Sequence, residues 1–247
     1  MLVLGRFSAI FIYIVGMVRK KGCILLFLML LFVCGCKDSR TSRGNDALRI
    51  GDFDRAVHNF SAVLDDNPLD RDARYGLSLS YYAIAEEQER LKSGTRALWE
   101  RAVREFQILW NVDSSMKISE TYSNSLFYLA KATLSENTKA NVLSMVDRSI
   151  ELDSLNFFSL NLKALIFEQL FRTEEAKDIY VYIITRQPQF LSAYINLGNV
   201  YWREGDVSSA WDIWSMGLKQ DAKNPTLLYW TQVAEDSLAS LMKAGKL

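Results

Sequence analysis

The sequence predicts an all-α protein, on three observations. The 247 residues include only 3 prolines and 12 glycines, which is too few for many short strands joined by tight turns. Residues that favour helices, such as Ala, Leu, Arg and Glu, are abundant. The last third of the chain repeats itself every 34 residues, a period typical of a helix–turn–helix unit. A stack of such units is therefore expected.

The charge balance and the rare residues exclude several classes of function. The 29 basic residues equal the 29 acidic ones, whereas nucleic-acid binding needs a clustered excess of Lys and Arg. The three cysteines, Cys23, Cys34 and Cys36, lie together near the start, and the single histidine is His58. We therefore expect no nucleic-acid partner, no metal site, no cofactor and no catalytic residue.

Residues 1–35 have the composition of a signal peptide. They contain no acidic residue, and two apolar blocks, 7–18 and 22–35, flank three basic residues. Each block is shorter than the roughly 20 apolar residues that cross a bilayer, which makes a transmembrane helix the weaker interpretation. Beginning at Met17, the order is basic, apolar and then small residues, as in a secretory signal. Met17 is the expected true start.

The end of this segment resembles the lipobox of bacterial lipoproteins. The residues Val33-Cys34-Gly35-Cys36 place aliphatic and small residues before a cysteine. The resemblance implies that Cys36 carries acyl chains and becomes the first residue of the mature protein, anchored by those chains in the membrane. Lys37 favours the outer membrane over the inner one. The alternative is an ordinary signal peptide that leaves Cys36 free or paired with another chain.

The repeat is clearest in two successive units. Gly198 follows Ala164 by 34 residues, and Trp214 follows Tyr180 by the same interval. The motif Leu197-Gly198-x-x-Tyr201, then Gly205-Asp206, Ala210 and Trp214, resembles the tetratricopeptide repeat (TPR). In that family, small residues let two antiparallel helices approach and the aromatic residues fill the space around them. The resemblance implies a right-handed α–α superhelix.

The other elements follow from the same pattern. Residues 36–247 are expected to form one TPR-like domain of about five helix pairs, with a capping helix that begins at Pro225. The unit at 157–188 departs from the family pattern at Lys163, expected to hold its ammonium in water, and at Phe171, where the turn glycine is usual. The second pair carries extra residues, which would extend its first helix through 86–96 as far as Gly94. A solvated helix end is preferred there over a docking site.

The resemblance also implies a concave groove lined by the first helix of each pair. Its amide, aromatic and guanidinium groups suit the recognition of a peptide or a helix. For Trp202 and other aromatic residues, packing between repeats is the alternative. The predicted partner-binding residues are Phe158, Asn161, Leu165, Ile195, Asn199, Trp202 and Arg203, with Glu168 and Gln169 beside them. The residues Tyr75, Leu79, Tyr82, Phe127 and Lys131 would continue the surface.

Three functional classes remain after these observations. The first is a lipid-anchored scaffold that binds a protein or peptide partner in cell-envelope assembly, on the periplasmic side of the outer membrane. The second is a glycan- or nutrient-binding helical-repeat lipoprotein. The third, an enzyme, fits worst, because the chain has no glycine-rich phosphate loop, serine-nucleophile elbow or metal-ligand cluster. No small-molecule substrate is expected.

Overall fold

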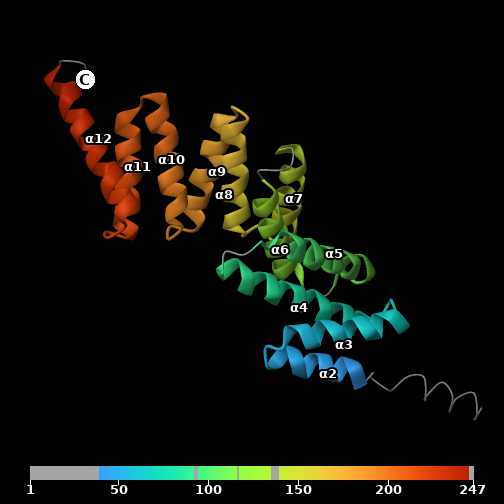
Figure 1. Cartoon of the computed structure of the whole chain (residues 1–247). Helices are drawn as coiled ribbons and strands as arrows, with labels where there is room; N and C mark the ends of the chain where they lie inside the picture. The colour runs from blue at the N-terminus through green and yellow to red at the C-terminus, as the bar shows by residue number, and fades with distance from the viewer. Residues whose placement is uncertain (1–38, 92–93, 116, 135–138, 245–247) are drawn as a thin grey trace, which may run out of the picture. The chain divides into compact units, whose positions relative to one another are not determined.

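The computed structural model describes residues 39–91, 94–115, 117–134 and 139–244. The predicted signal segment 1–35 and Cys36 lie outside these ranges. Within them the chain is helical throughout and contains no strand, as predicted (Figure 1). The helices are α2 (Ser39–Arg49), α3 (Phe53–Asp66), α4 (Arg71–Arg90), α5 (Arg96–Val112), α6 (Ser119–Thr133), α7 (Lys139–Leu152), α8 (Phe157–Gln169), α9 (Thr173–Arg186), α10 (Leu191–Glu204), α11 (Val207–Gln220) and α12 (Pro225–Lys243).

The described helices form two compact units, which divide between Gly76 and Leu77. The expectation of one continuous domain over 36–247 stays a prediction. Among the helices of the described ranges, none has both the length and the apolar character that a bilayer-spanning helix needs.

The first unit contains the helix pair α2 and α3. The buried ring of Phe60 on α3 lies against Gly44 of α2, where a Cβ atom would be 2.7 Å from the ring. Gly51 turns the chain between the helices with a φ of 78°. The Asp52 carboxylate then accepts a hydrogen bond from the backbone N–H of Arg55 and caps α3. These residues take the structural roles that the repeat pattern predicts.

The second unit contains the pairs α6/α7, α8/α9 and α10/α11, and each helix packs on the next in the chain. Figure 1 shows α8 to α12 as neighbouring helices in chain order. The small residues Ala164, Ala176 and Ala210 are fully buried, which lets the helices of a pair approach closely. The predicted capping helix α12 begins at Pro225 and packs on α11.

A buried network of hydroxyl and amide groups joins α6, α7 and α8. The hydroxyl oxygen of Ser149 lies 2.8 Å from that of Ser123 and 2.7 Å from that of Ser159. The Asn156 amide donates to the Ser123 hydroxyl at 2.9 Å and to the Asn124 side chain at 3.0 Å. Because buried polar groups are costly when they lack partners, this network favours one register of the three helices.

The long helix predicted in the second pair is α4, which runs for 20 residues. It ends at Arg90 and does not continue to Gly94, so the predicted extension was too long; Lys92 lies outside the described residues. The Glu89 carboxylate accepts hydrogen bonds from the Lys131 ammonium of α6 and from the Thr95 hydroxyl, both at 2.9 Å. These contacts hold the end of α4 against its neighbours, which agrees with the interpretation as a stabilised helix end.

The expectation for Lys163 was wrong in one respect. Its ammonium is not simply hydrated, because it lies 2.7 Å from the Asp147 carboxylate of α7 and 5.5 Å from the centre of the Phe167 ring. The sequence pattern hid this pair, since Asp147 belongs to the preceding helix pair.

Candidate functional site

The candidate site lies on α8 and α10, the first helices of two successive pairs. Asn156 begins α8, since its side chain accepts a hydrogen bond from the backbone N–H of Ser159. Gly205 ends α10 with a φ of 83°, in the left-handed region that favours glycine. Between these ends, the predicted binding residues recur at intervals of three or four, which places them along one face of each helix.

The Phe158 ring is 59% exposed at the start of this face. It lies between the rings of Phe127 on α6 and Phe190 before α10, with centres 5.7 Å and 5.3 Å away. Contacts on both sides fix an aromatic ring that solvent still reaches. Phe158 can therefore offer a partner an apolar surface with little loss of side-chain entropy.

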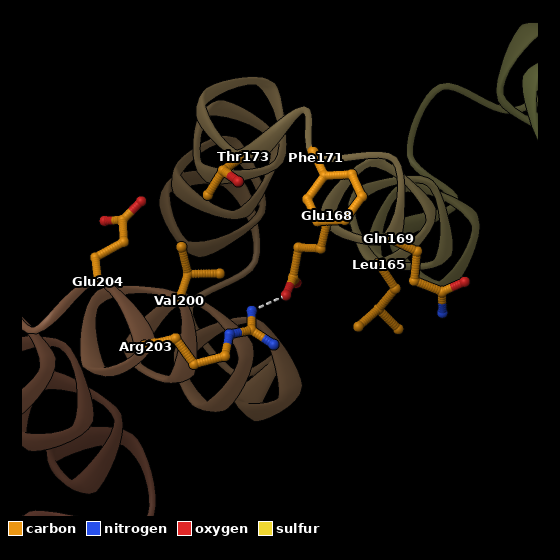
Figure 2. A pocket seen from close by; sticks show the side chains of 8 residues that line it. All are labelled: Leu165, Glu168, Gln169, Phe171, Thr173, Val200, Arg203 and Glu204. Carbon is orange, nitrogen blue, oxygen red and sulfur yellow. Dashed lines mark hydrogen bonds and ion pairs between the residues drawn. The ribbon is translucent and has the colours of Figure 1, made fainter.

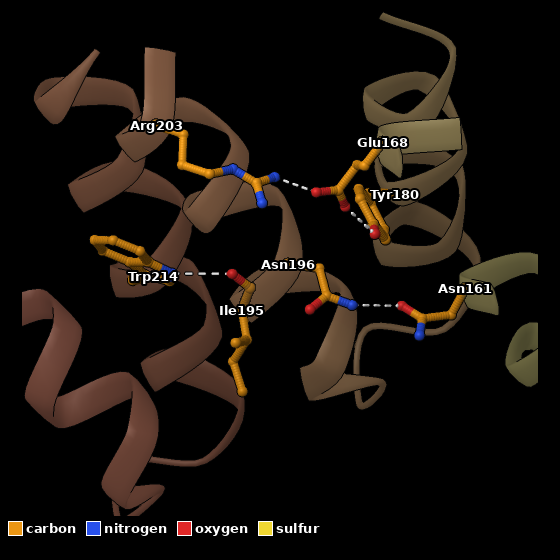
Figure 3. Close-up of polar contacts among 7 residues, drawn as sticks. All are labelled: Asn161, Glu168, Tyr180, Ile195, Asn196, Arg203 and Trp214. Carbon is orange, nitrogen blue, oxygen red and sulfur yellow. Dashed lines mark hydrogen bonds and ion pairs between the residues drawn. The ribbon is translucent and has the colours of Figure 1, made fainter. Parts of the chain in front are cut away.

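The two predicted amides and Ile195 lie in different environments. The Asn196 amide donates a hydrogen bond to the Asn161 side chain at 2.9 Å and links α10 to α8 (Figure 3). Asn199 is half-buried on the same helix. Ile195 packs against the cluster around Trp214, and its backbone carbonyl accepts the indole N–H of Trp214 at 3.3 Å.

Trp202 belongs to a cluster of tryptophan rings between α10, α11 and α12. Its ring centre lies 6.0 Å from that of Trp214 and 6.1 Å from that of Trp230, and these two stack on each other at 5.4 Å. The ring is half-buried. Packing between repeats accounts for this residue, which was the alternative interpretation of the sequence.

A carboxylate connects the two helix pairs across the candidate site. Glu168 of α8 accepts a hydrogen bond from the Tyr180 hydroxyl at 2.5 Å and pairs with the Arg203 guanidinium of α10 (Figure 3). The Glu168 side chain is only 12% exposed, whereas that of Arg203 is 61% exposed. Burial, with the Glu168 carboxylate second, raises the pKa of Tyr180 above its ordinary value of 10.0. Its hydroxyl is therefore a permanent donor at neutral pH.

A pocket of about 450 Å³ lies beside this pair of charges (Figure 2). This volume falls within the roughly 300–1,000 Å³ of ligand pockets in general. The pocket brings together Leu165 and Arg203 of the predicted set, with Glu168 and Gln169. The other residues around it are Phe171, Thr173, Val200 and Glu204, which were not predicted as site residues.

Phe171 is the most informative of the unpredicted residues. Its sequence position was recognised as a departure from the glycine of the turn, but its role was not. The residue has a φ of 58° and its side chain is 94% exposed, at the edge of the pocket. An aromatic residue in place of a turn glycine is the sequence signal that could have found it.

Two further findings concern catalysis. His58 lies exposed on α3, as predicted. In the part of the chain that the structure describes, no group of three His, Cys, Asp or Glu side chains is arranged to hold a metal ion.

The comparisons with known proteins agree on the fold. Residues 41–89 match a family model described as tetratricopeptide repeat. The human protein "Tetratricopeptide repeat protein 6" is 27% identical over 200 residues, which are 73% of this chain and 38% of that protein. The chain therefore spans well under half of this relative's length.

Two solved structures are similar over most of both chains. The crystal structure of MamA has a TM-score of 0.53 and 19% identity, and the match covers 73% of this chain and 95% of MamA. The structure of YrrB, titled "a TPR protein with an unusual peptide-binding site", has a TM-score of 0.54 and 14% identity, over 76% of this chain and 88% of YrrB. The helix pairs, the family match at 41–89 and these neighbours together show that this chain has the fold of a tetratricopeptide repeat protein.

Proposed function

We propose that this chain is a non-catalytic scaffold that binds a protein or peptide partner on the first-helix face of α8 and α10. The observation that carries the proposal is the open pocket between these helices, with an ion pair and an amide at its rim. Apolar walls with a few fixed polar groups are typical of sites that recognise peptides. YrrB, which has a similar fold, is described by its title as having a peptide-binding site.

The side chains on this face supply complementary contacts. Phe158 offers an exposed aromatic ring, and Asn199 has an amide that can donate to and accept from a peptide backbone. Arg203 has five N–H donors, and its printed ion pair with Glu168 uses one nitrogen. A partner segment lying along α8 and α10 would therefore find an apolar contact, an amide and a cation in one row.

The proposal places this scaffold in the bacterial cell envelope, held by acyl chains on Cys36 at the periplasmic side of the outer membrane. The order of basic, apolar and small residues before Cys36 supports this part of the proposal. Replacing Cys36 with serine is then expected to give a soluble periplasmic form or an unprocessed precursor. Unchanged mass and unchanged membrane fractionation of C36S would contradict lipidation.

Crosslinking in the native envelope, followed by mass spectrometry, tests the binding face. A specific partner is expected for the unmodified chain and is expected to be lost when Phe158 and Asn199 are both replaced by alanine. Val181→Ala is the matched control, because Val181 is half-exposed on α9, a second helix. Recovery of the same proteins from all three chains would contradict the proposed face.

Isothermal titration separates the scaffold from a glycan- or nutrient-binding lipoprotein. With envelope or dietary glycans the scaffold is expected to give no binding heat. Saturable heat that disappears in the Phe158→Ala variant would favour the glycan-binding function instead.

A further inference from the structure

The turn between α8 and α9 contains an unusual residue at a position that glycine occupies elsewhere in the chain. Gly51 and Gly205 turn their pairs with φ values of 78° and 83°, and Phe171 does so with 58°. In the described ranges, Phe171 is the one non-glycine residue with a positive φ. An L residue with a Cβ atom is disfavoured in this region, and a bulky one especially.

The hydrogen bonds of the turn do not require phenylalanine. The backbone N–H of Phe171 donates to the carbonyl of Glu168 at 3.1 Å, and that of Arg172 donates to the carbonyl of Phe167 at 2.9 Å. The turn at Gly205 has the same pair of bonds, from Gly205 to Trp202 at 3.1 Å and from Asp206 to Tyr201 at 3.0 Å. Glycine therefore supports the same geometry without the disfavoured conformation.

Internal packing does not explain Phe171 either. Its side chain is 94% exposed, so it contributes almost nothing to the core. A large apolar ring that is both exposed and held in a disfavoured backbone conformation indicates a role in binding. Figure 2 shows the ring beside Glu168 at the edge of the pocket.

The charges around the pocket indicate what kind of group enters it. Glu168 is paired with Arg203 and accepts the Tyr180 hydroxyl, and Glu204 lies 2.7 Å from the Lys177 ammonium. Each carboxylate of the pocket thus already has a cation of this chain beside it. A charged ligand would have to displace one of these partners, whereas an uncharged group would not.

We infer that the pocket takes one large apolar side chain of a partner peptide, with Phe171, Leu165 and Val200 as its apolar walls. This inference rests on the proposed function, because the same partner would lie along α8 and α10. The Gln169 amide and the Arg203 guanidinium at the rim would donate to carbonyl groups of the peptide on either side of the inserted residue. Phe171 is then the specificity-determining residue of the site.

A titration followed by methyl NMR tests the inference on the full chain. The probes are four blocked pentapeptides, acetyl-Gly-Gly-X-Gly-Gly-amide, in which X is tryptophan, leucine, lysine or glutamate. The tryptophan and leucine peptides are expected to shift the methyl signals of Leu165, Val200 and Thr173, and the charged peptides are not. In the Phe171→Gly variant the affinity for the tryptophan peptide is expected to fall about tenfold.

The matched control is Gly205→Phe, which puts the same ring on the equivalent turn of the next pair. A Cβ atom at Gly205 meets nothing within 4 Å, so the ring has space there, and this variant is expected to bind the peptide as the parent does. Equal affinity of the parent and Phe171→Gly, or equal binding of all four peptides, would overturn the inference.

A further variant separates this failure from failure of the proposed function. If Phe158→Ala abolishes partner crosslinking while Phe171→Gly changes neither crosslinking nor peptide affinity, the binding face stands and the pocket inference falls. If neither variant changes partner crosslinking or peptide affinity, both fall.

Discussion

The pairs α8/α9 and α10/α11 build the same frame from different residues. The two pairs lie 34 residues apart in sequence, so Ala164 corresponds to Gly198 and Tyr180 to Trp214. A Cβ atom at Gly198 would lie 2.2 Å from the indole nitrogen of Trp214, whereas Ala164 keeps its methyl group in a fully buried position. The larger ring thus requires glycine on the facing helix, and the smaller ring leaves room for a methyl group.

The two rings also differ in their polar ends. The Trp214 indole donates to a backbone carbonyl of its own pair, that of Ile195. The Tyr180 hydroxyl donates to Glu168, which in turn pairs with Arg203 of the next pair. The exchange of one aromatic residue for another therefore changes an internal contact into a link between two pairs, beside the pocket. The frame is shared, and the chemistry of the surface comes from such exchanges.

The largest expected effect comes from Gly198→Ala. The new methyl group would collide with the buried Trp214 ring, and overpacking of this kind costs about 3 kcal/mol. Urea denaturation measures the loss in the free energy of unfolding. The control is Gly94→Ala, where a Cβ atom meets nothing within 4 Å, and a change within about 0.5 kcal/mol is expected. Equal stabilities of the two variants would show that the close contact of Gly198 and Trp214 is not needed.

The link through Glu168 is expected to have the next largest effect. Glu168→Ala leaves the buried Tyr180 hydroxyl without its acceptor, which costs about 2 kcal/mol. In a Tyr180→Phe background the same substitution is expected to cost much less, because no hydroxyl remains to be satisfied. Double-mutant cycles from denaturant unfolding measure this coupling. Additive effects of the two substitutions would contradict the link.

Stability is expected to depend on alkaline pH through Tyr180. Burial and Glu168 raise its pKa in the folded protein above the ordinary 10.0 of the unfolded chain. The unfolded chain therefore loses this proton first, so the free energy of unfolding is constant below pH 10 and falls above it, by at most about 1.4 kcal/mol per pH unit. Burial also raises the pKa of Tyr194 and Tyr122, so Tyr180→Phe should reduce this slope without abolishing it. An unchanged slope in Tyr180→Phe would be the contrary result.

The two turns provide the smallest and most specific pair of effects. Phe171→Gly relieves a disfavoured backbone conformation and is expected to stabilise the chain by about 1 kcal/mol. Gly205→Ala introduces the same conformation for an L residue and is expected to destabilise it by about 1 kcal/mol. Calorimetric melting of both variants measures the two shifts. A loss of stability in Phe171→Gly would mean that the ring is structural.

The frame could be predicted from sequence because it depends on local spacing. Gly198, Ala210 and Trp214 recur at fixed intervals, and Pro225 begins a helix wherever the helix is placed. The helices and their pairing follow from these patterns. Phe171 was visible as an exception to the pattern, but its backbone conformation and exposure needed coordinates.

The contacts between pairs could not be predicted in the same way. Arg203 meets Glu168 and Lys163 meets Asp147 across helix pairs, at distances that depend on how the pairs stack. The buried network around Ser149 was missed because serine on a helix usually faces solvent. The predicted set for the site was also mixed for this reason: Leu165 and Arg203 meet at the pocket, while Trp202 packs in the tryptophan cluster.

The central claim is that the first-helix face of α8 and α10 binds a partner protein. Photo-crosslinking from single positions in living cells tests it most directly, with a photoreactive phenylalanine analogue at position 158 on α8 or at position 181 on α9. The account predicts a discrete crosslinked partner from position 158 and none from position 181. The same products from both positions, or a partner from position 181 alone, would contradict it.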